Sequence, residues 1–160
     1  MRLHVAAIGK LKSGPEKMLA HDYASRIETM GRKAGINSLK ITDFSESQSQ
    51  TPSQRMTEEA AILWAALPPS AHVIALDERG PSHSSEVLAS RIGKLADQGV
   101  NDLAFLIGGA DGHAPETRKK ANELLSFGAM TWPHRLVRIM LFEQIYRSVT
   151  ILLNHPYHRP

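Results

Sequence analysis

The last residues of the chain, Asn154 to Pro160, concentrate side chains that can bind and react. These positions hold two imidazoles, a phenol and a guanidinium, from His155, Tyr157, His158 and Arg159. An arginine beside exposed aromatic rings is suited to hold phosphates and to stack on unpaired bases. Chain ends are usually frayed and easily changed, so this composition predicts a tail that meets a partner.

A basic patch precedes this tail. Four arginines and three histidines follow Thr131, against the single acid Glu143. Because the whole chain carries a net charge of only +3, an anionic partner has to be met by such a local patch. A solvated helix face followed by a tail explains the same residues equally well, so the patch alone leaves both interpretations open.

Other chemistries are poorly supported by the sequence. His155 and His158 could bind a metal together with His134, but the tail has no carboxylate and Pro156 breaks helical spacing, so we expect no metal site. The chain has no cysteine, which excludes disulfides, thiolate metal sites and cysteine nucleophiles. It also lacks the serine elbow of hydrolases and a phosphate-binding loop.

The length and the start of the chain limit its organisation. With 160 residues and 42% apolar content, the sequence predicts one domain over residues 1–160. The apolar run at the start is too short for a signal peptide or a membrane span. We therefore expect a cytoplasmic protein with no membrane partner.

The pattern of apolar residues predicts the elements that position the reactive side chains. Strands are expected at 3–9, 36–44, 72–77 and 102–109, with a short fifth strand near 128–132. Helices are expected over 15–33, from Thr51 as N-cap to about Leu67, from Ser84 to Asp97, after Pro115, and from Pro133 to about Leu153. The polar stretch 45–54 predicts a mobile surface loop. This alternation of apolar strands with helices predicts an α/β fold, a mainly parallel sheet flanked by helices.

Three loops are candidates for a binding site, because ligands of open parallel sheets bind beyond the carboxyl ends of the strands. These loops are LDERGP at 76–81, IGGADGHAP at 107–115 and TWPHR at 131–135. The three glycines of the second loop would let the backbone approach a ligand closely. A tight turn without a ligand explains those glycines equally well.

The last helix, 133–153, predicts a second subunit. Its apolar residues cover most of the circumference, whereas a helix on the outside of a monomer keeps a polar face. We expect one face to pack on the sheet and another on a second copy of the chain, a central core helix being the alternative. Glu143 and Arg147, four residues apart, are expected to pair with each other.

Five stretches stand in order along the whole chain: VAAIGKLK, VIALDERG, FLIGGADG, LSFGAMTWPHRLVRIMLFEQIYR and NHPYHR. Through them the chain resembles the ribosomal RNA large subunit methyltransferase H family, the pseudouridine N3-methyltransferases of 23S rRNA within the SPOUT class. The sequence departs from many members at Pro81, where they carry a lysine. Pro81 is not one of the donor-binding positions that the resemblance implies, and it lies outside the tail.

The resemblance implies a fold and a cofactor. It implies a minimal SPOUT domain whose C-terminal part forms a deep trefoil knot, in a homodimer that uses S-adenosyl-L-methionine as methyl donor. The implied donor-binding residues are Leu76, Gly108, Phe127, Gly128, Ala129, Met130, Thr131 and Trp132. They fall on the same three loops or beside them.

The resemblance also implies a role for the tail. A minimal SPOUT protein has no separate RNA-binding domain, so its own rim and tail must recognise RNA. Tyr157, His158 and Arg159 of one subunit would place the target pseudouridine near the donor pocket of the other, with His134 and Arg138 on the rim of the knot. The base that removes the N3 proton stays open between His158, His134 and water.

The implied activity is methylation at N3 of a pseudouridine in 23S rRNA of the assembled ribosome. A non-catalytic ribosome-binding or assembly factor with a SPOUT fold is the alternative. The intact IGG and TWPH stretches favour the enzyme, because a pure binding protein needs no donor pocket. A SPOUT enzyme that acts on transfer RNA is disfavoured by the terminal NHPYHR.

Overall fold

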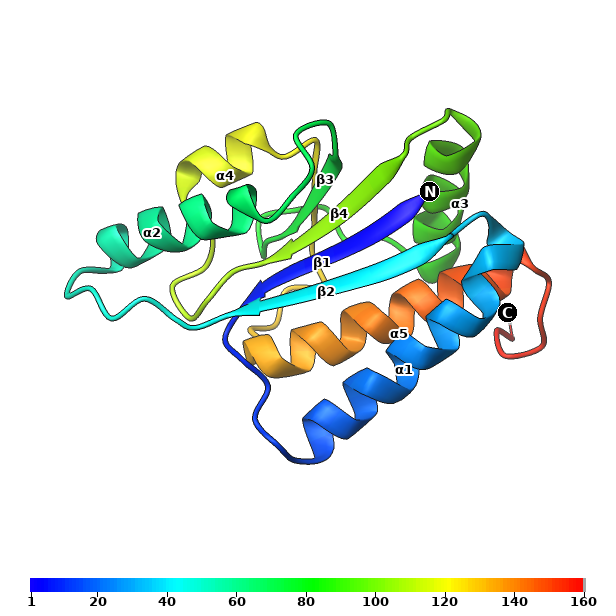
Figure 1. The fold of residues 1–160 in the computed structure, drawn as a ribbon, viewed down its shortest axis with the longest axis horizontal. Helices are drawn as coiled ribbons and strands as arrows, with labels where there is room; N and C mark the ends of the chain where they lie inside the picture. Colours follow the sequence, from blue (N-terminus) through cyan, green and yellow to red (C-terminus); the bar gives the residue numbers. More distant parts are fainter. Residues whose placement is uncertain (160) are drawn as a thin grey trace.

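A five-stranded parallel sheet forms the centre of the molecule in the computed structural model, which describes residues 1–159 (Figure 1). The strands are β1 (Arg2–Ile8), β2 (Ser38–Phe44), β3 (His72–Leu76), β4 (Asp102–Ile107) and β5 (Glu123–Leu125). Their order in the sheet is β2-β1-β4-β3-β5. All pairings are parallel, so every carboxyl end lies at the same edge.

Helices cover both faces of this sheet. The helices are α1 (Pro15–Gly31), followed by the short turn η1 (Arg32–Ala34), α2 (Pro52–Ala65), α3 (Ser85–Asp97), α4 (Pro115–Lys120) and α5 (His134–Leu152). Helices α1, α3 and α5 pack together on one face, while α2 and α4 lie over the other (Figure 1). Among residues 1–159, no helix is both long enough and apolar enough to cross a membrane.

Alternate residues of β1 pack into two hydrophobic cores, one on each face of the sheet. Leu3, Val5 and Ala7 of β1 pack toward α1, α3 and α5, whereas Ala6 and Ile8 pack with residues of α2. Since both faces of the strand are covered, β1 reads as a continuous apolar run, and all six residues of β4 are buried. The predicted parallel sheet flanked by helices is confirmed.

The predicted fifth strand near 128–132 is wrong. The strand is β5, which ends three residues before the predicted strand was expected to start, and it pairs Glu123, Leu124 and Leu125 with β3. Its first residue is a glutamate whose Oε1 lies 2.8 Å from Arg91 Nε, so no apolar run marks it. Met130 is 71% exposed, so the apolar side chain that suggested a strand there belongs to a loop.

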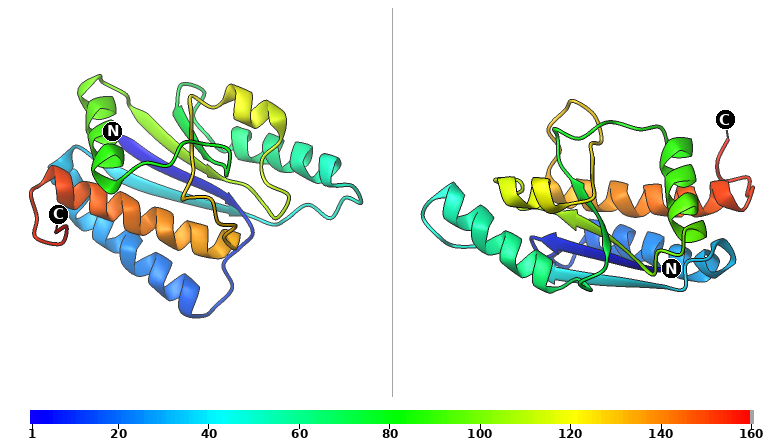
Figure 2. Two further views of the ribbon diagram at one scale, coloured as in Figure 1. Left: turned by 180° about the vertical axis from the view of Figure 1, so that it is seen from behind. Right: turned by 90° about the horizontal axis from the view of Figure 1, so that it is seen from above.

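The connections after β3 and after β5 cross each other. The Asp77 amide donates to the Leu125 carbonyl, and the Ser126 amide donates to the Pro81 carbonyl, both at 3.0 Å. A Cβ on Gly80 would lie 2.8 Å from the Leu125 nitrogen, so only glycine fits at this crossing. The chain then continues into α5, which packs against both α1 and α3 (Figure 2). Crossing connections of this kind are expected for the trefoil knot that the resemblance implies.

Two local predictions concern the helices. Thr51 caps α2 as expected, because its Oγ1 accepts from the Gln54 amide at 3.2 Å, but the helix ends at Ala65 and not at Leu67. Glu143 and Arg147 pair within α5, with 2.6 Å between Arg147 Nη2 and Glu143 Oε1. Both side chains also contact the tail, which the i, i+4 pattern could not indicate.

Candidate functional site

A cleft of about 260 Å³ opens at the carboxyl edge of the sheet. Three segments line it: residues 76–79 at the end of β3, 109–113 after β4, and 125–128 with 130–132 at the end of β5. Val137 of α5 and Arg118 of α4 complete the lining. The cleft therefore lies at the edge that the strand-end argument selected, and parts of all three predicted loops line it.

Six of the eight predicted donor-binding residues line this cleft, namely Leu76, Phe127, Gly128, Met130, Thr131 and Trp132. Gly108 and Ala129 do not line it. Gly108 instead faces its own loop, since an added Cβ would meet the carbonyl carbon and oxygen of Gly112 at 3.0 Å. Its small size closes a tight turn, which is the alternative that the glycine pattern left open.

The loop after β5 has an unusual backbone. Gly128 has φ +109°, in the left-handed region that favours glycine. The Ser126 hydroxyl braces this turn, because it accepts from the Gly128 amide at 3.2 Å and donates to the Gly128 carbonyl at 3.0 Å. The braced turn presents Phe127, Met130 and Trp132 to the cleft.

Charged side chains in the cleft were missed by the sequence analysis. Asp77 directly follows β3, and its side chain is buried. Its Oδ1 accepts from the Arg79 amide at 3.0 Å, and its Oδ2 lies 3.5 Å from Arg118 Nη1. The place of Asp77 in LDERGP was a usable signal, because it follows a strand. Arg118 comes from α4, and nothing in its local sequence indicated the cleft.

A buried histidine also faces the cleft. His113 follows the glycine loop, its Nε2 lies 3.3 Å from the Leu106 carbonyl, and burial lowers its pKa below the ordinary value. The imidazole is therefore neutral at pH 7, which fixes Nε2 as the protonated nitrogen that donates to the carbonyl. The Arg118 guanidinium donates to the backbone carbonyl of His113, so these two residues are hydrogen-bonded to each other beside the cleft.

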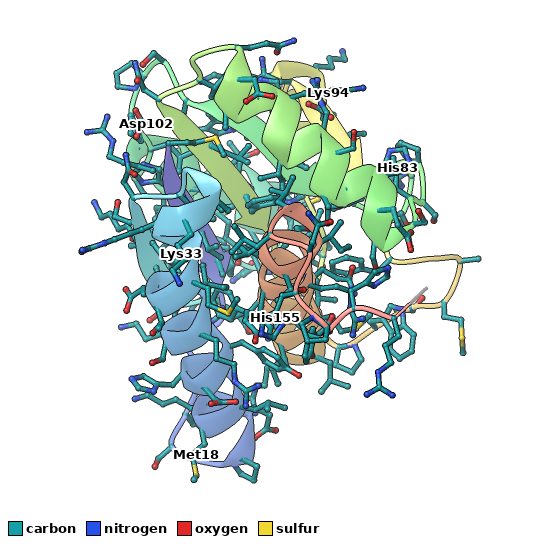
Figure 3. The ribbon with its side chains drawn as sticks, turned by 90° about the vertical axis from the view of Figure 1, so that its right-hand side faces the viewer. Met18, Lys33, His83, Lys94, Asp102 and His155 are labelled. Atoms are coloured by element: carbon teal, nitrogen blue, oxygen red, sulfur yellow. The ribbon has the colours of Figure 1, made fainter. Side chains whose placement is uncertain are left out.

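The tail folds back on its own subunit. The Tyr157 hydroxyl donates to Glu143 Oε1 at 3.1 Å, and its ring meets the Tyr146 ring edge-on at 4.8 Å. His158 Nε2 lies 3.0 Å from Glu86 Oε1 at the start of α3. Figure 3 shows this segment from His155 onward beside α5. None of the tail residues up to Arg159 lines the cleft of the same chain.

His134 and Arg138, at the start of α5, point away from the cleft toward the ends of β1 and β2. His134 Nε2 lies 3.4 Å from Glu46 Oε1, outside the cleft lining. Arg138 is 1% exposed, donates to the Gly9 carbonyl at 2.6 Å and lies 2.8 Å from Asp43. The prediction that Arg138 lies on the rim is wrong, because its helix face turns into the core.

A family model and two relatives of known name each match nearly the whole chain. A family model described as predicted SPOUT methyltransferase matches residues 1–158. The ribosomal RNA large subunit methyltransferase H of Rhodopseudomonas palustris is 52% identical, over 99% of both chains. The enzyme of the same name from a Bradyrhizobium species is 51% identical, over 99% of this chain and 98% of that one.

One solved structure supports the fold. The crystal structure of a methylase family protein from Neisseria gonorrhoeae has a TM-score of 0.51 and 16% identity, over 91% of this chain and 80% of that chain. At this identity the likeness concerns the arrangement of strands and helices alone.

Proposed function

This chain belongs to the ribosomal RNA large subunit methyltransferase H family of SPOUT methyltransferases, and on that premise we propose that it methylates 23S rRNA with S-adenosylmethionine as methyl donor. The observation that carries the proposal is the cleft, in which six residues implied by the resemblance come together from two crossing loops. A protein that only bound the ribosome would have no use for a built pocket of this kind.

The residues of the cleft fit such a donor. Leu76, Phe127 and Trp132 offer apolar walls for a flat ring, and the open turn at Gly128, with no atom within 4 Å of an added Cβ, leaves backbone groups accessible. S-adenosylmethionine would supply a methyl group made electrophilic by its sulfonium. The task of the chain is then to hold the donor in one orientation and to exclude water from it.

The finer part of the proposal concerns the target and the tail. We propose the N3 atom of a pseudouridine in the assembled ribosome as the methyl acceptor. Tyr157, His158 and Arg159 would place this nucleotide, and His134, which lies outside the cleft lining of its own chain, would be a further contact to the RNA. The base that takes the N3 proton stays unassigned among His158, His134 and water. A ribosomal substrate puts the reaction in the cytoplasm.

A homodimer would bring the tail to a cleft. In one chain the tail contacts Glu143 and Glu86, and both of these also line an apolar groove that shares residues 125–128 with the cleft. Leu19 and Val87 beside this groove are exposed apolar side chains. A second copy packed on the groove would cover them and carry its own tail to the neighbouring cleft.

The first experiment measures transfer of labelled methyl from S-adenosylmethionine to intact ribosomes that lack the modification. The full-length chain is compared with a chain truncated after Leu153. We expect incorporation by the full-length chain and loss on truncation. Binding to the ribosome without incorporation would favour the assembly factor over the enzyme.

A second experiment separates the tail from the pocket. Arg159→Ala should weaken RNA methylation far more than binding of S-adenosylmethionine measured by calorimetry. Lys94→Ala is the matched control, since Lys94 is an exposed cation in the last turn of α3, at the end opposite the tail contact at Glu86. Equal losses of methylation and donor binding in Arg159→Ala would contradict this division of roles.

A further inference from the structure

Figure 1 shows the loop between β2 and α2 near the loop after β4 that lines the cleft. Side-chain contacts from α2 connect these two loops. Arg55, in the first turn of α2, makes a two-pronged ion pair with Asp111, with Nε to Oδ2 at 2.6 Å and Nη2 to Oδ1 at 3.0 Å. The same guanidinium donates through Nη1 to the carbonyls of Ser49 and Gln50 at 3.0 and 3.1 Å. One side chain thus ties two loops together.

Glu59 lies against the same loop one helical turn later. Its side chain is buried, with the residue 4% exposed, and its Oε1 accepts from the Ser47 amide at 2.9 Å. Its other oxygen, Oε2, has no hydrogen-bond partner within the described part of the chain. A Cβ added to Gly109 would lie 2.7 Å from this Oε2, so the carboxylate sits directly beneath the backbone of Gly109.

The fastened segment is the wall of the cleft. Gly109, Ala110, Asp111 and Gly112 all line it. We propose that Arg55 and Glu59 are positioning residues that hold the Gly109–Gly112 wall in its donor-binding geometry. Neither residue lines the cleft. The inference rests on the proposed function, because it assumes that this cleft binds S-adenosylmethionine.

The physical argument concerns preorganisation. A segment with two glycines and one alanine in four residues has little side-chain packing of its own and many accessible backbone conformations. Charge-assisted, two-pronged arginine pairs are the strongest hydrogen-bonded contacts that such a segment can receive from outside. Released from Arg55, the wall would have to be ordered when the donor binds, and that cost would appear as lost affinity.

The roles of the two residues differ. Arg55 acts on the tip of the wall through Asp111, which is partly exposed. Glu59 acts from below and also fixes Ser47, so it couples the wall to the start of the polar loop. The fastenings contradict the expectation that residues 45–54 form a freely mobile loop, since Ser47, Ser49 and Gln50 are each bonded to α2.

The test compares binding of S-adenosylmethionine to the full-length protein and its variants by calorimetry. Arg55→Ala should weaken binding roughly tenfold by the ordering cost of the wall, and Arg55→Lys should recover part of the loss because the charge remains. Glu59→Gln keeps the acceptor for Ser47 and should lose less than Glu59→Ala. In methyl transfer, KM for the donor should rise while kcat at saturating donor stays close to that of the unchanged protein.

A matched control separates positioning from stability. Arg2 makes a similar two-pronged pair with Asp102, at 2.8 and 2.6 Å, at the opposite edge of the sheet. Arg2→Ala should leave donor affinity unchanged. Hydrogen exchange of the amides of residues 109–112 should accelerate in Arg55→Ala and not in Arg2→Ala.

Three outcomes would overturn the inference in different ways. Unchanged donor affinity in both Arg55→Ala and Glu59→Ala would overturn the positioning role and leave the proposed function intact. An unchanged protein that binds no S-adenosylmethionine would overturn the proposed function and the inference with it. Equal losses of affinity in Arg55→Ala and Arg2→Ala would assign the effect to general destabilisation.

Discussion

The buried ion pair between Arg138 and Asp43 allows a prediction about the order of two substitutions. The Arg138 side chain is 1% exposed and that of Asp43 is 30% exposed, with 2.8 Å between them. Asp43→Asn removes the charge that compensates a buried guanidinium, while Arg138→Met removes the buried charge itself. We therefore expect Asp43→Asn to destabilise the protein more than Arg138→Met.

The expected loss of stability in each variant depends on which charge remains after the substitution. Removal of one partner of a buried pair typically costs about 3–5 kcal/mol, and the partial exposure of Asp43 puts Asp43→Asn near the lower end. After Arg138→Met, Asp43 can recover water, so the main loss is the hydrogen bond to the Gly9 carbonyl, about 1.5–3 kcal/mol for a charged donor. Burial already lowers the pKa of Arg138, consistent with the cost of holding this charge in the core.

The assay is urea unfolding at pH 7 without donor, read as the free energy of unfolding by linear extrapolation. For a chain of this size a loss of about 3 kcal/mol corresponds to a fall of roughly 6–12 °C in Tm. Asp22→Asn is the control, because Asp22 also lies 2.8 Å from an arginine, Arg26, but both side chains are about half exposed. That control should change stability by less than about 1 kcal/mol. The reasoning is refuted if Arg138→Met costs more than Asp43→Asn, or if Asp43→Asn matches the control.

Three further predictions concern single sites. Gly80→Ala should lower the free energy of unfolding measured in urea by about 1–3 kcal/mol, because the new Cβ would meet the backbone of Leu125 where the two connections cross. An unchanged free energy of unfolding would mean that this crossing is loosely packed. Burial lowers the pKa of His113, so as the pH falls the unfolded chain binds a proton at this residue before the folded protein does. The free energy of unfolding should therefore fall as the pH drops below about 6.5, by up to roughly 1.4 kcal/mol per pH unit. His113→Gln should flatten that slope in unfolding measured from pH 7 to 5, and an unchanged slope would assign it to other groups. Thr51→Ala should cost about 1 kcal/mol through loss of the cap on Gln54, against no measurable loss for the exposed Ser53→Ala beside it in thermal melts.

The sequence predicted the position of the cleft better than it predicted the residues that line it. Strand ends are visible as the close of an apolar run, so the loops at 76–81, 107–115 and 131–135 could be identified from local pattern. Roles within a loop depend on which way each side chain points. Gly108 was expected to face a ligand, but it faces Gly112, because the turn closes on itself.

The tail also shows that local sequence does not indicate where side chains point. Its residue types indicated binding, and its contacts were invisible in the sequence. Tyr157 meets Glu143 and Tyr146, and His158 meets Glu86, through a reversal of the chain after α5. Asn154, the one non-glycine residue with positive φ among residues 1–159, marks that reversal. Asparagine tolerates this conformation, but its presence alone does not predict a turn.

The sequence by itself determined the elements whose signals are local. Alternate burial of strand residues on two covered faces, the cap at Thr51 and the pair Glu143–Arg147 each depend on neighbours within a few positions. The tertiary structure alone decided the place of β5, the burial of Arg138 and the fastening of the cleft wall by Arg55 and Glu59. In each case the residue or strand that makes the contact lies far away in the sequence. Whether a charge is buried or a loop is held in place therefore depends on which strand ends the fold brings together.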